Sequence, residues 1–175
     1  GEEIHKNEDI IDFTNTALTD FLIRLSVDVE QSDETVIGSY FHVLNDLERI
    51  GDHAENFFGI VEDMSRKKLS FSAQAQEKIR KMYDKVSEMF SVSREAFETQ
   101  DKTLLTRLSE LENDVDGLKR KLTAEHFARL ADGQCSVECS PYYSSLISGL
   151  ERVADHLINV GYSITNPTGA QREAI

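Results

Sequence analysis

A ten-residue string recurs in this chain with four positions changed, and the duplication constrains the fold more than any other feature of the sequence. Residues 47–56 read LERIGDHAEN and residues 150–159 read LERVADHLIN, so six of the ten positions are identical at an offset of 103. An acidic string stands upstream of each copy, EDIID at 8–12 and ENDVD at 112–116. Self-similarity at a fixed offset indicates that one structural unit is present twice.

Apolar residues recur in steps of three and four along almost the whole chain, the spacing of an amphipathic α-helix. Only two prolines interrupt the chain, so long helices are allowed. Capping and turn signals such as Asp132-Gly133 and Ser140-Pro141 separate the periodic segments. The predicted fold class is all-α, with tandem helical-bundle repeats and five long helices over residues 4–29, 34–64, 73–98, 102–130 and 141–164.

The charge of the chain limits its partners. Lys and Arg number 19 against 32 Asp and Glu, which gives a formal net charge of −13. Nucleic acids and anionic membrane surfaces both select basic faces, so neither is an expected partner. No apolar run approaches the roughly 18 residues that cross a bilayer. Cys135 and Cys139 form no disulfide framework, which favours a reducing compartment; packing or surface roles are expected for them, with a weak metal or redox site as the alternative.

The first half carries two Glu-x-x-x-Asp motifs whose spacing has a geometric consequence. Residues four apart lie on one face of an α-helix, so each motif presents two carboxylates to the same neighbour. If the first two helices form an antiparallel hairpin centred at residue 30, Glu8 lies level with Asp52, and Asp12 lies level with Glu48. A polar break at 30–33 places a turn at this centre independently.

The second half repeats this arrangement. A hairpin centred between residues 133 and 134 brings Glu112 level with Asp155, and Asp116 level with Glu151. That centre falls beside the turn that Asp132-Gly133 predicts. Four carboxylates that converge between two helices repel one another unless exposure, protonation or a bound cation relieves the repulsion.

Oxygen-rich ligand sets without thiolates suit hard or borderline metal ions, among them iron, manganese, magnesium and calcium. The sequence therefore predicts two metal sites with these candidate ligands: Glu8, Asp12, Glu48, Asp52, Glu112, Asp116, Glu151 and Asp155. Side chains on the following turns are possible accessory ligands: Asn56, Asn159, His53 and His156.

Two arginines offer a competing interpretation of the same acids. Arg49 and Arg152 directly follow Glu48 and Glu151, and salt bridges from these guanidinium groups could neutralise the carboxylates without any metal. Their position, one residue round the helix, predicts that they lie beside each cluster.

The paired strings LERIGDHAEN and LERVADHLIN, each with an upstream Glu/Asp-x-x-x-Asp motif, resemble the PhoU family of phosphate-uptake regulators. The similarity covers residues 4–165 and is greatest to the PhoU-like cytosolic region appended to bacterial sodium/phosphate cotransporters. The resemblance implies two three-helix bundles with metal clusters, commonly iron, at the eight acids named above. It further implies control of phosphate transport without catalysis, through contact with a fused or separate transporter, in the cytoplasm at the inner face of the membrane.

The family repeat has three helices, and its motifs lie on the second and third. In this chain the helix at 73–98 would open the second repeat, and the first repeat would lack its opening helix. We therefore expect a truncated first repeat at 1–70, a complete second repeat at 71–165 and a flexible tail at 166–175, in a piece of a longer polypeptide. An incomplete bundle exposes an apolar groove, which predicts a homo-oligomer.

Two alternatives remain at this stage. One is a free-standing PhoU-type negative regulator of phosphate transport and signalling. The other, from a different class, is a ferritin-like di-metal oxidase, which requires Glu-x-x-His on two helices. Here the histidine lies five positions after the glutamate, from Glu48 to His53 and from Glu151 to His156, a rotation of about 140° around the helix. We therefore do not expect an enzyme.

Overall fold

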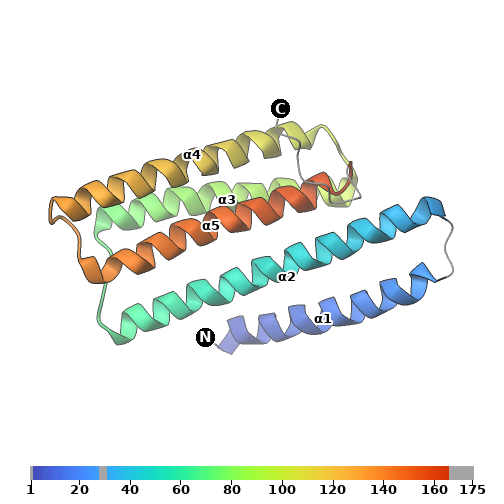
Figure 1. Cartoon of the computed structure of the whole chain (residues 1–175), viewed down its shortest axis with the longest axis horizontal. Helices are drawn as coiled ribbons and strands as arrows, with labels where there is room; N and C mark the ends of the chain where they lie inside the picture. Colours follow the sequence, from blue (N-terminus) through green and yellow to red (C-terminus); the bar gives the residue numbers. More distant parts are fainter. Residues whose placement is uncertain (1, 28–30, 166–175) are drawn as a thin grey trace.

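The computed structural model describes residues 2–27 and 31–165, and almost all of them are helical (Figure 1). In chain order the elements are α1 (Glu2–Ser26), α2 (Gln31–Arg66), α3 (Ala73–Thr99), α4 (Leu104–Ala131), the short 3₁₀ helix η1 (Val137–Cys139) and α5 (Ser140–Tyr162). The described residues include no strand. The predicted all-α class with five long helices is confirmed.

The helix ends agree with the sequence signals except near the first turn. Helix α2 begins at Gln31, three residues before the predicted start, so Asp33 and Glu34 lie in its first turn. Acidic side chains there interact favourably with the positive end of the helix dipole. The predicted hairpin centre at residue 30 and the predicted tail at 166–175 lie outside the described residues.

The start of α3 and the end of α4 show why the chain turns where it does. The Ser72 hydroxyl caps α3 by accepting a hydrogen bond from the Ala75 N–H at 3.2 Å. Helix α4 ends at Ala131, and Gly133 follows with a φ of +67°, a conformation that glycine adopts without a Cβ penalty. Pro141 occupies the first turn of α5, where its missing N–H breaks no helical bond.

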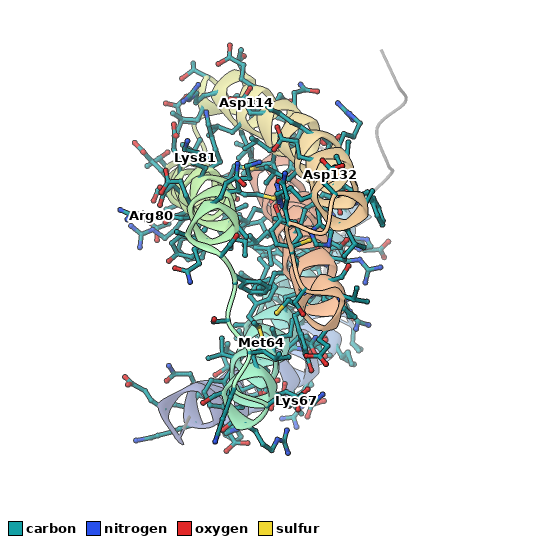
Figure 2. All side chains as sticks on the ribbon, turned by 90° about the vertical axis from the view of Figure 1, so that its left-hand side faces the viewer. Met64, Lys67, Arg80, Lys81, Asp114 and Asp132 are labelled. Carbon is teal, nitrogen blue, oxygen red and sulfur yellow. The ribbon has the colours of Figure 1, made fainter. Side chains whose placement is uncertain are left out.

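Helices α3, α4 and α5 pack against one another and enclose the main hydrophobic core (Figure 2). Met82 and Met89 from α3 and Leu108, Leu111 and Val115 from α4 are fully buried in it. Charged side chains such as Arg80 and Lys81 lie on the outer face of α3. Burial of these apolar side chains is the main stabilising term for the three-helix unit.

Helices α1 and α2 form a hairpin that joins the three-helix unit through α2 and α5 (Figure 1). Ile50 and Phe57 of α2 pack against the core of that unit. Gly51 permits a close approach of α1, because a Cβ at this position would lie 3.3 Å from Ile11 Cδ1. A larger side chain at this position would therefore press against α1.

Helix α1 packs chiefly against α2 and leaves much of its apolar surface open. Phe13 is 75% exposed and Phe21 is 59% exposed. Among the described helices, none combines the length and the apolar character that crossing a bilayer requires.

Candidate metal centre

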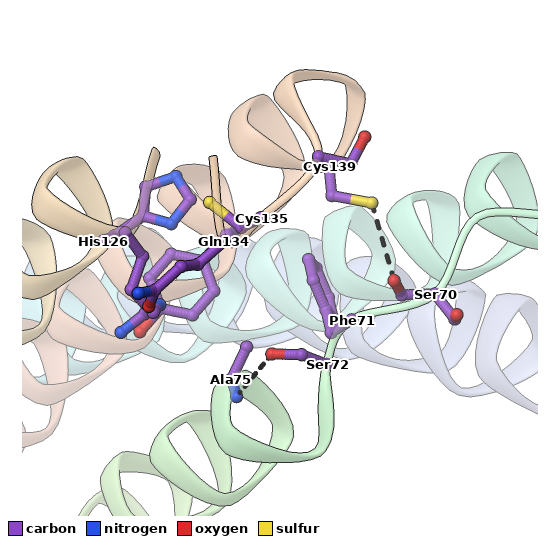
Figure 3. Close-up of a pocket in the computed structure, with 11 residues that line it drawn as sticks. Ser70, Phe71, Ser72, Ala75, His126, Gln134, Cys135 and Cys139 are labelled. Carbon is purple, nitrogen blue, oxygen red and sulfur yellow. Dashed lines mark hydrogen bonds between the residues drawn. The ribbon is translucent and has the colours of Figure 1, made fainter. Parts of the chain in front are cut away.

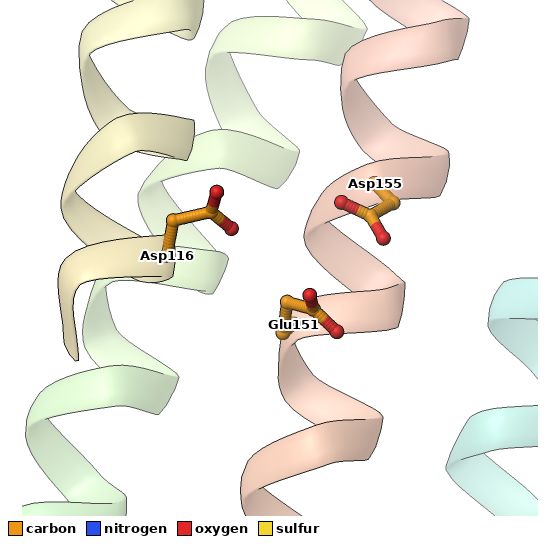
Figure 4. A group of neighbouring side chains, drawn as sticks. All are labelled: Asp116, Glu151 and Asp155. Carbon is orange, nitrogen blue, oxygen red and sulfur yellow. The ribbon is translucent and has the colours of Figure 1, made fainter. Parts of the chain in front are cut away.

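Three of the predicted ligands meet between α4 and α5. Asp116 projects from α4 towards Glu151 and Asp155, which lie one turn apart on α5 (Figure 4). One oxygen from each carboxylate lies within 4.8 Å of the other two. Within residues 2–27 and 31–165, no other set of three His, Cys, Asp or Glu ligand atoms is this close. All three side chains are partly buried.

The electrostatics of this cluster favour a positive charge. Burial, together with the neighbouring charges of Glu151, Asp116 and Glu112, raises the pKa of Asp155 to about 6. Lys119 acts in the opposite direction. Glu112, the fourth predicted ligand of this set, is therefore close enough to act on Asp155, although it stands outside the group of three.

Basic residues of α4 already neutralise part of this charge. Lys119 Nζ lies 2.6 Å from Glu151 Oε1, and Arg120 Nη1 lies 3.9 Å from Asp116 Oδ2. Lys119 was not among the predicted site residues. Its position three residues after Asp116 places it on the same helix face, but this spacing does not show that it reaches Glu151 on α5.

The first predicted ligand set, between α1 and α2, is less closely clustered than the set between α4 and α5. Burial raises the pKa of Glu8, with further contributions from Asp12, Glu55, Asp52 and Asp9 in that order. Acids from α1 and α2 therefore do face one another across this hairpin. Among the described residues, they do not bring three ligand atoms as close together as the set between α4 and α5.

In this hairpin, Arg49 forms the kind of salt bridge that could neutralise the acids without a metal. Arg49 Nη1 lies 3.3 Å from Asp52 Oδ2, so this acid has a cationic partner on its own helix. Glu48, one turn before Asp52, is partly buried. Glu55 was not among the predicted ligands, yet it also lies in this hairpin, with its Oε1 3.1 Å from His5 Nδ1.

Most of the candidate accessory ligands lie at a different interface. His156 Nδ1 is 2.7 Å from Asp46 Oδ1, and Asn159 Nδ2 donates to the same oxygen at 3.3 Å. The rings of His53 and His156 lie 5.9 Å apart between α2 and α5. Asn56 is exposed on α2. These contacts place the two histidines and Asn159 in the junction between the hairpin and the three-helix unit.

Comparison with known protein families agrees with this architecture. The model of the PhoU domain matches residues 1–61 and 79–164, which is most of the chain. The chain belongs to the PhoU family. The two matched segments are separated by the end of α2 and the start of α3, where the hairpin gives way to the three-helix unit.

Two named PhoU relatives are similar over most of this chain. The "Phosphate-specific transport system accessory protein PhoU homolog 1" of Thermotoga maritima is 25% identical over 154 residues, covering 81% of this chain and 66% of its own length. A PhoU homolog of Clostridium acetobutylicum with the same accessory-protein description is 25% identical over 163 residues, covering 91% of this chain and 73% of its own length. This PhoU chain therefore corresponds to about two thirds to three quarters of those relatives.

The donor set of this PhoU chain fits a metal ion. Asp116, Glu151 and Asp155 provide only oxygen ligands, and their partial exposure leaves room for water as a further ligand. Such a set suits a hard or borderline cation.

Proposed function

We propose that this chain is a metal-binding regulatory domain that controls phosphate uptake, as the cytosolic part of a sodium-dependent phosphate transporter. Family membership and the accessory-protein names of its relatives support the link to phosphate transport. The observation that carries the metal-binding part is the convergence of Asp116, Glu151 and Asp155 between two helices.

Asp116, Glu151 and Asp155 would hold the metal, with Glu112 beside them. Iron is the proposed ion, with manganese, magnesium or calcium as the alternatives for an all-oxygen set. A bound cation offsets the mutual repulsion of these acids and links α4 to α5. Metal binding would thereby stabilise the three-helix unit that contacts the transporter.

The proposed partner is a phosphate transporter, either fused to this domain or separate, at the cytoplasmic face of the cell membrane. Nucleic acid is not a proposed partner, because the net charge is −13. The proposed role is regulatory and not enzymatic.

Self-association through α1 belongs to the same proposal. Exposed apolar side chains gather on one side of this helix: Ile10, Phe13, Leu18, Phe21 and Leu25. A second copy of the chain, packed against this face, would remove them from water. Light scattering is expected to show a dimer or larger species, and Phe13→Glu combined with Phe21→Glu is expected to yield monomers. A strictly monomeric parent protein would contradict this part.

A ferritin-like oxidase is the alternative from another class, and the histidine contacts count against it. His156 bonds to Asp46, and His53 faces His156, so neither ring is directed at the acids between α4 and α5. An oxidase would consume oxygen when ferrous iron is added, and we expect no turnover beyond the background rate.

Metal content tests the site directly. Elemental analysis of freshly purified protein is expected to show bound metal, and Asp155→Ala combined with Asp116→Ala is expected to lose it. Asp132→Asn is the matched control, because this exposed acid lies at the end of α4, about 24 Å along the helix from Asp116. Equal metal content in all three proteins would show that the assignment is wrong.

The regulatory part is tested in cells that carry this domain on its transporter. Phosphate uptake is expected to respond abnormally to external phosphate when Asp116 and Asp155 are both replaced by alanine. Uptake that is unchanged in the double variant would leave the metal site without a role in transport.

A further inference from the structure

A buried arginine that makes no well-aligned hydrogen bond lies near the end of α4, 13 residues after Asp116 of the candidate metal centre. Arg129, in the last turn of α4, is 7% exposed. Among the described residues, none accepts a hydrogen bond from its three guanidinium nitrogens. Glu125, one turn earlier, bonds instead to Lys78. Glu125 is close enough to interact with the Arg129 charge, but it leaves the three guanidinium nitrogens without an acceptor. Buried donors without acceptors are costly, so a ligand that accepts hydrogen bonds from them would stabilise this site.

Arg129 lines a pocket of about 240 Å³, which we call the Arg129 pocket. It lies where the segment between α2 and α3, the end of α4 and the loop before α5 meet (Figure 3). Eleven described residues line it, and none of them is Asp or Glu. The absence of acids among these lining residues is notable in a chain with 32 acidic residues.

Hydrogen-bond donors surround this positive charge. The buried Tyr143 hydroxyl makes no hydrogen bond of suitable geometry among the described residues, although Arg129 is near enough to lower the Tyr143 pKa against the effect of burial. The Arg129 guanidinium carbon lies 5.7 Å from the Tyr143 ring centroid. Ser72 and Ser136 accept hydrogen bonds from the Ala75 and Glu138 N–H groups, which leaves their hydroxyl hydrogens able to donate. The pocket also adjoins the N-terminus of α3, whose first turn contains no acidic residue.

We propose that the Arg129 pocket binds a small free oxyanion of the phosphate or sulfate type. The guanidinium would form two parallel hydrogen bonds to it, and the Tyr143 and serine hydroxyls would donate to its remaining oxygens. Water does not reach the guanidinium nitrogens in this conformation. The ligand therefore enters by displacing the exposed loop residues Asp132, Gly133 and Gln134. This site is separate from the carboxylate cluster and does not require a metal.

Inorganic phosphate is the probe for this site, with sulfate as a second oxyanion and chloride as the baseline. The protein is first stripped of metal with a chelator, so that phosphate cannot bind through an ion at Asp116 and Asp155. Phosphate at about ten times its Kd is expected to raise the Tm by about 3–6 °C. It is also expected to slow alkylation of Cys135, a partly exposed thiol that lines the pocket.

Arg129→Met removes the charge at nearly constant length. This variant is expected to melt at or above the parent temperature without phosphate, and to lose both the Tm response and the protection of Cys135. Arg80→Met, on the outer face of α3, is the matched control and keeps both responses. Tyr143→Phe is expected to weaken binding severalfold while the fold is retained.

Three results would overturn the proposal. The first is the absence of any response to phosphate or sulfate up to about 20 mM, a range in which a site with a millimolar Kd is occupied. The second is an Arg129→Met protein that still responds. The third is an Arg129→Met protein that unfolds or melts well below the parent without phosphate, since the guanidinium would then be satisfied within the protein itself.

Discussion

His53 and His156 occupy equivalent positions of the two repeated strings and face each other across the contact between α2 and α5, with ring centroids 5.9 Å apart. The two repeats therefore meet through the same residue of each. Because this histidine follows the motif aspartate by one position, it points about 100° away from the acids around the helix. In both copies of the string, the acids and the histidine therefore face different neighbouring helices.

Acidification is expected to weaken this contact through His53. Burial lowers the pKa of His53, and the charges of His156 and Arg152 lower it further. The folded state therefore binds fewer protons than the unfolded state near the ordinary histidine pKa of about 6.5, and stability falls as the pH drops through that value. Urea unfolding of His53→Gln between about pH 7.5 and pH 5.5 should show a smaller loss than the parent.

His42→Gln is the control for this experiment, because His42 is exposed on the same helix. Equal pH dependence in the parent and in His53→Gln would show that the facing histidines do not govern acid stability.

Asp155 should produce the opposite pH dependence in the metal-free protein. Its pKa of about 6 in the fold lies above the value of 3.8 for an unperturbed aspartate. The stabilising contribution of the protonated form is complete below about pH 4 and is lost as the pH rises through about 6. Asp155→Asn is therefore expected to be more stable than the parent at pH 7.5 by about 1–2 kcal/mol, after allowance for solvent screening.

Chemical denaturation with chelator present measures this difference, which should vanish near pH 4. Added metal should stabilise the parent and not the variant. A metal-free Asp155→Asn protein that is less stable than the parent at pH 7.5 would show that the carboxylate is not under repulsion.

The helices and the meeting of acids between α4 and α5 were predictable for the same reason. Periodicity in steps of three and four continues over each helix, and a hairpin with a known turn fixes which residues are level. Helix periodicity and the pairing of levels in a hairpin both depend only on residues within one repeat. Asp116, Glu151 and Asp155 follow from them, because a carboxylate every four residues stays on one face.

The contacts that the sequence did not reveal lie between repeats or depend on side-chain rotamers. Asp46 meets His156 because two separately periodic units pack through α2 and α5, and helix periodicity does not determine that packing. Lys119 reaches Glu151 through a long, flexible side chain that spacing alone cannot direct. The lack of a hydrogen-bond acceptor for the Arg129 guanidinium became visible only when its surroundings were known.

Removal of the lysine beside the candidate metal centre should strengthen metal binding. Lys119 and a metal ion compete for Glu151, since the ammonium lies 2.6 Å from the carboxylate oxygen. Lys119→Met is therefore expected to bind manganese or ferrous iron about tenfold more tightly, a change of about 1.4 kcal/mol. Calorimetric titration measures this change, and Lys121→Met, at an exposed position on α4, is the control. Unchanged or weaker binding would show that Glu151 is not a ligand.

The Asp46–His156 contact should hold the α1–α2 hairpin to the three-helix unit. The Asp46 side chain is only 14% exposed and accepts hydrogen bonds from α5. Replacement by alanine leaves His156 Nδ1 and the Asn159 amide without this acceptor, at an expected cost of about 1–3 kcal/mol. Urea unfolding measures the loss, and hydrogen exchange should show faster opening in α1 and α2 than in α3 and α4. Asp84→Ala, at an exposed site on α3, should be nearly neutral. A uniform increase in exchange over all five helices would mean that the hairpin and the three-helix unit unfold as one.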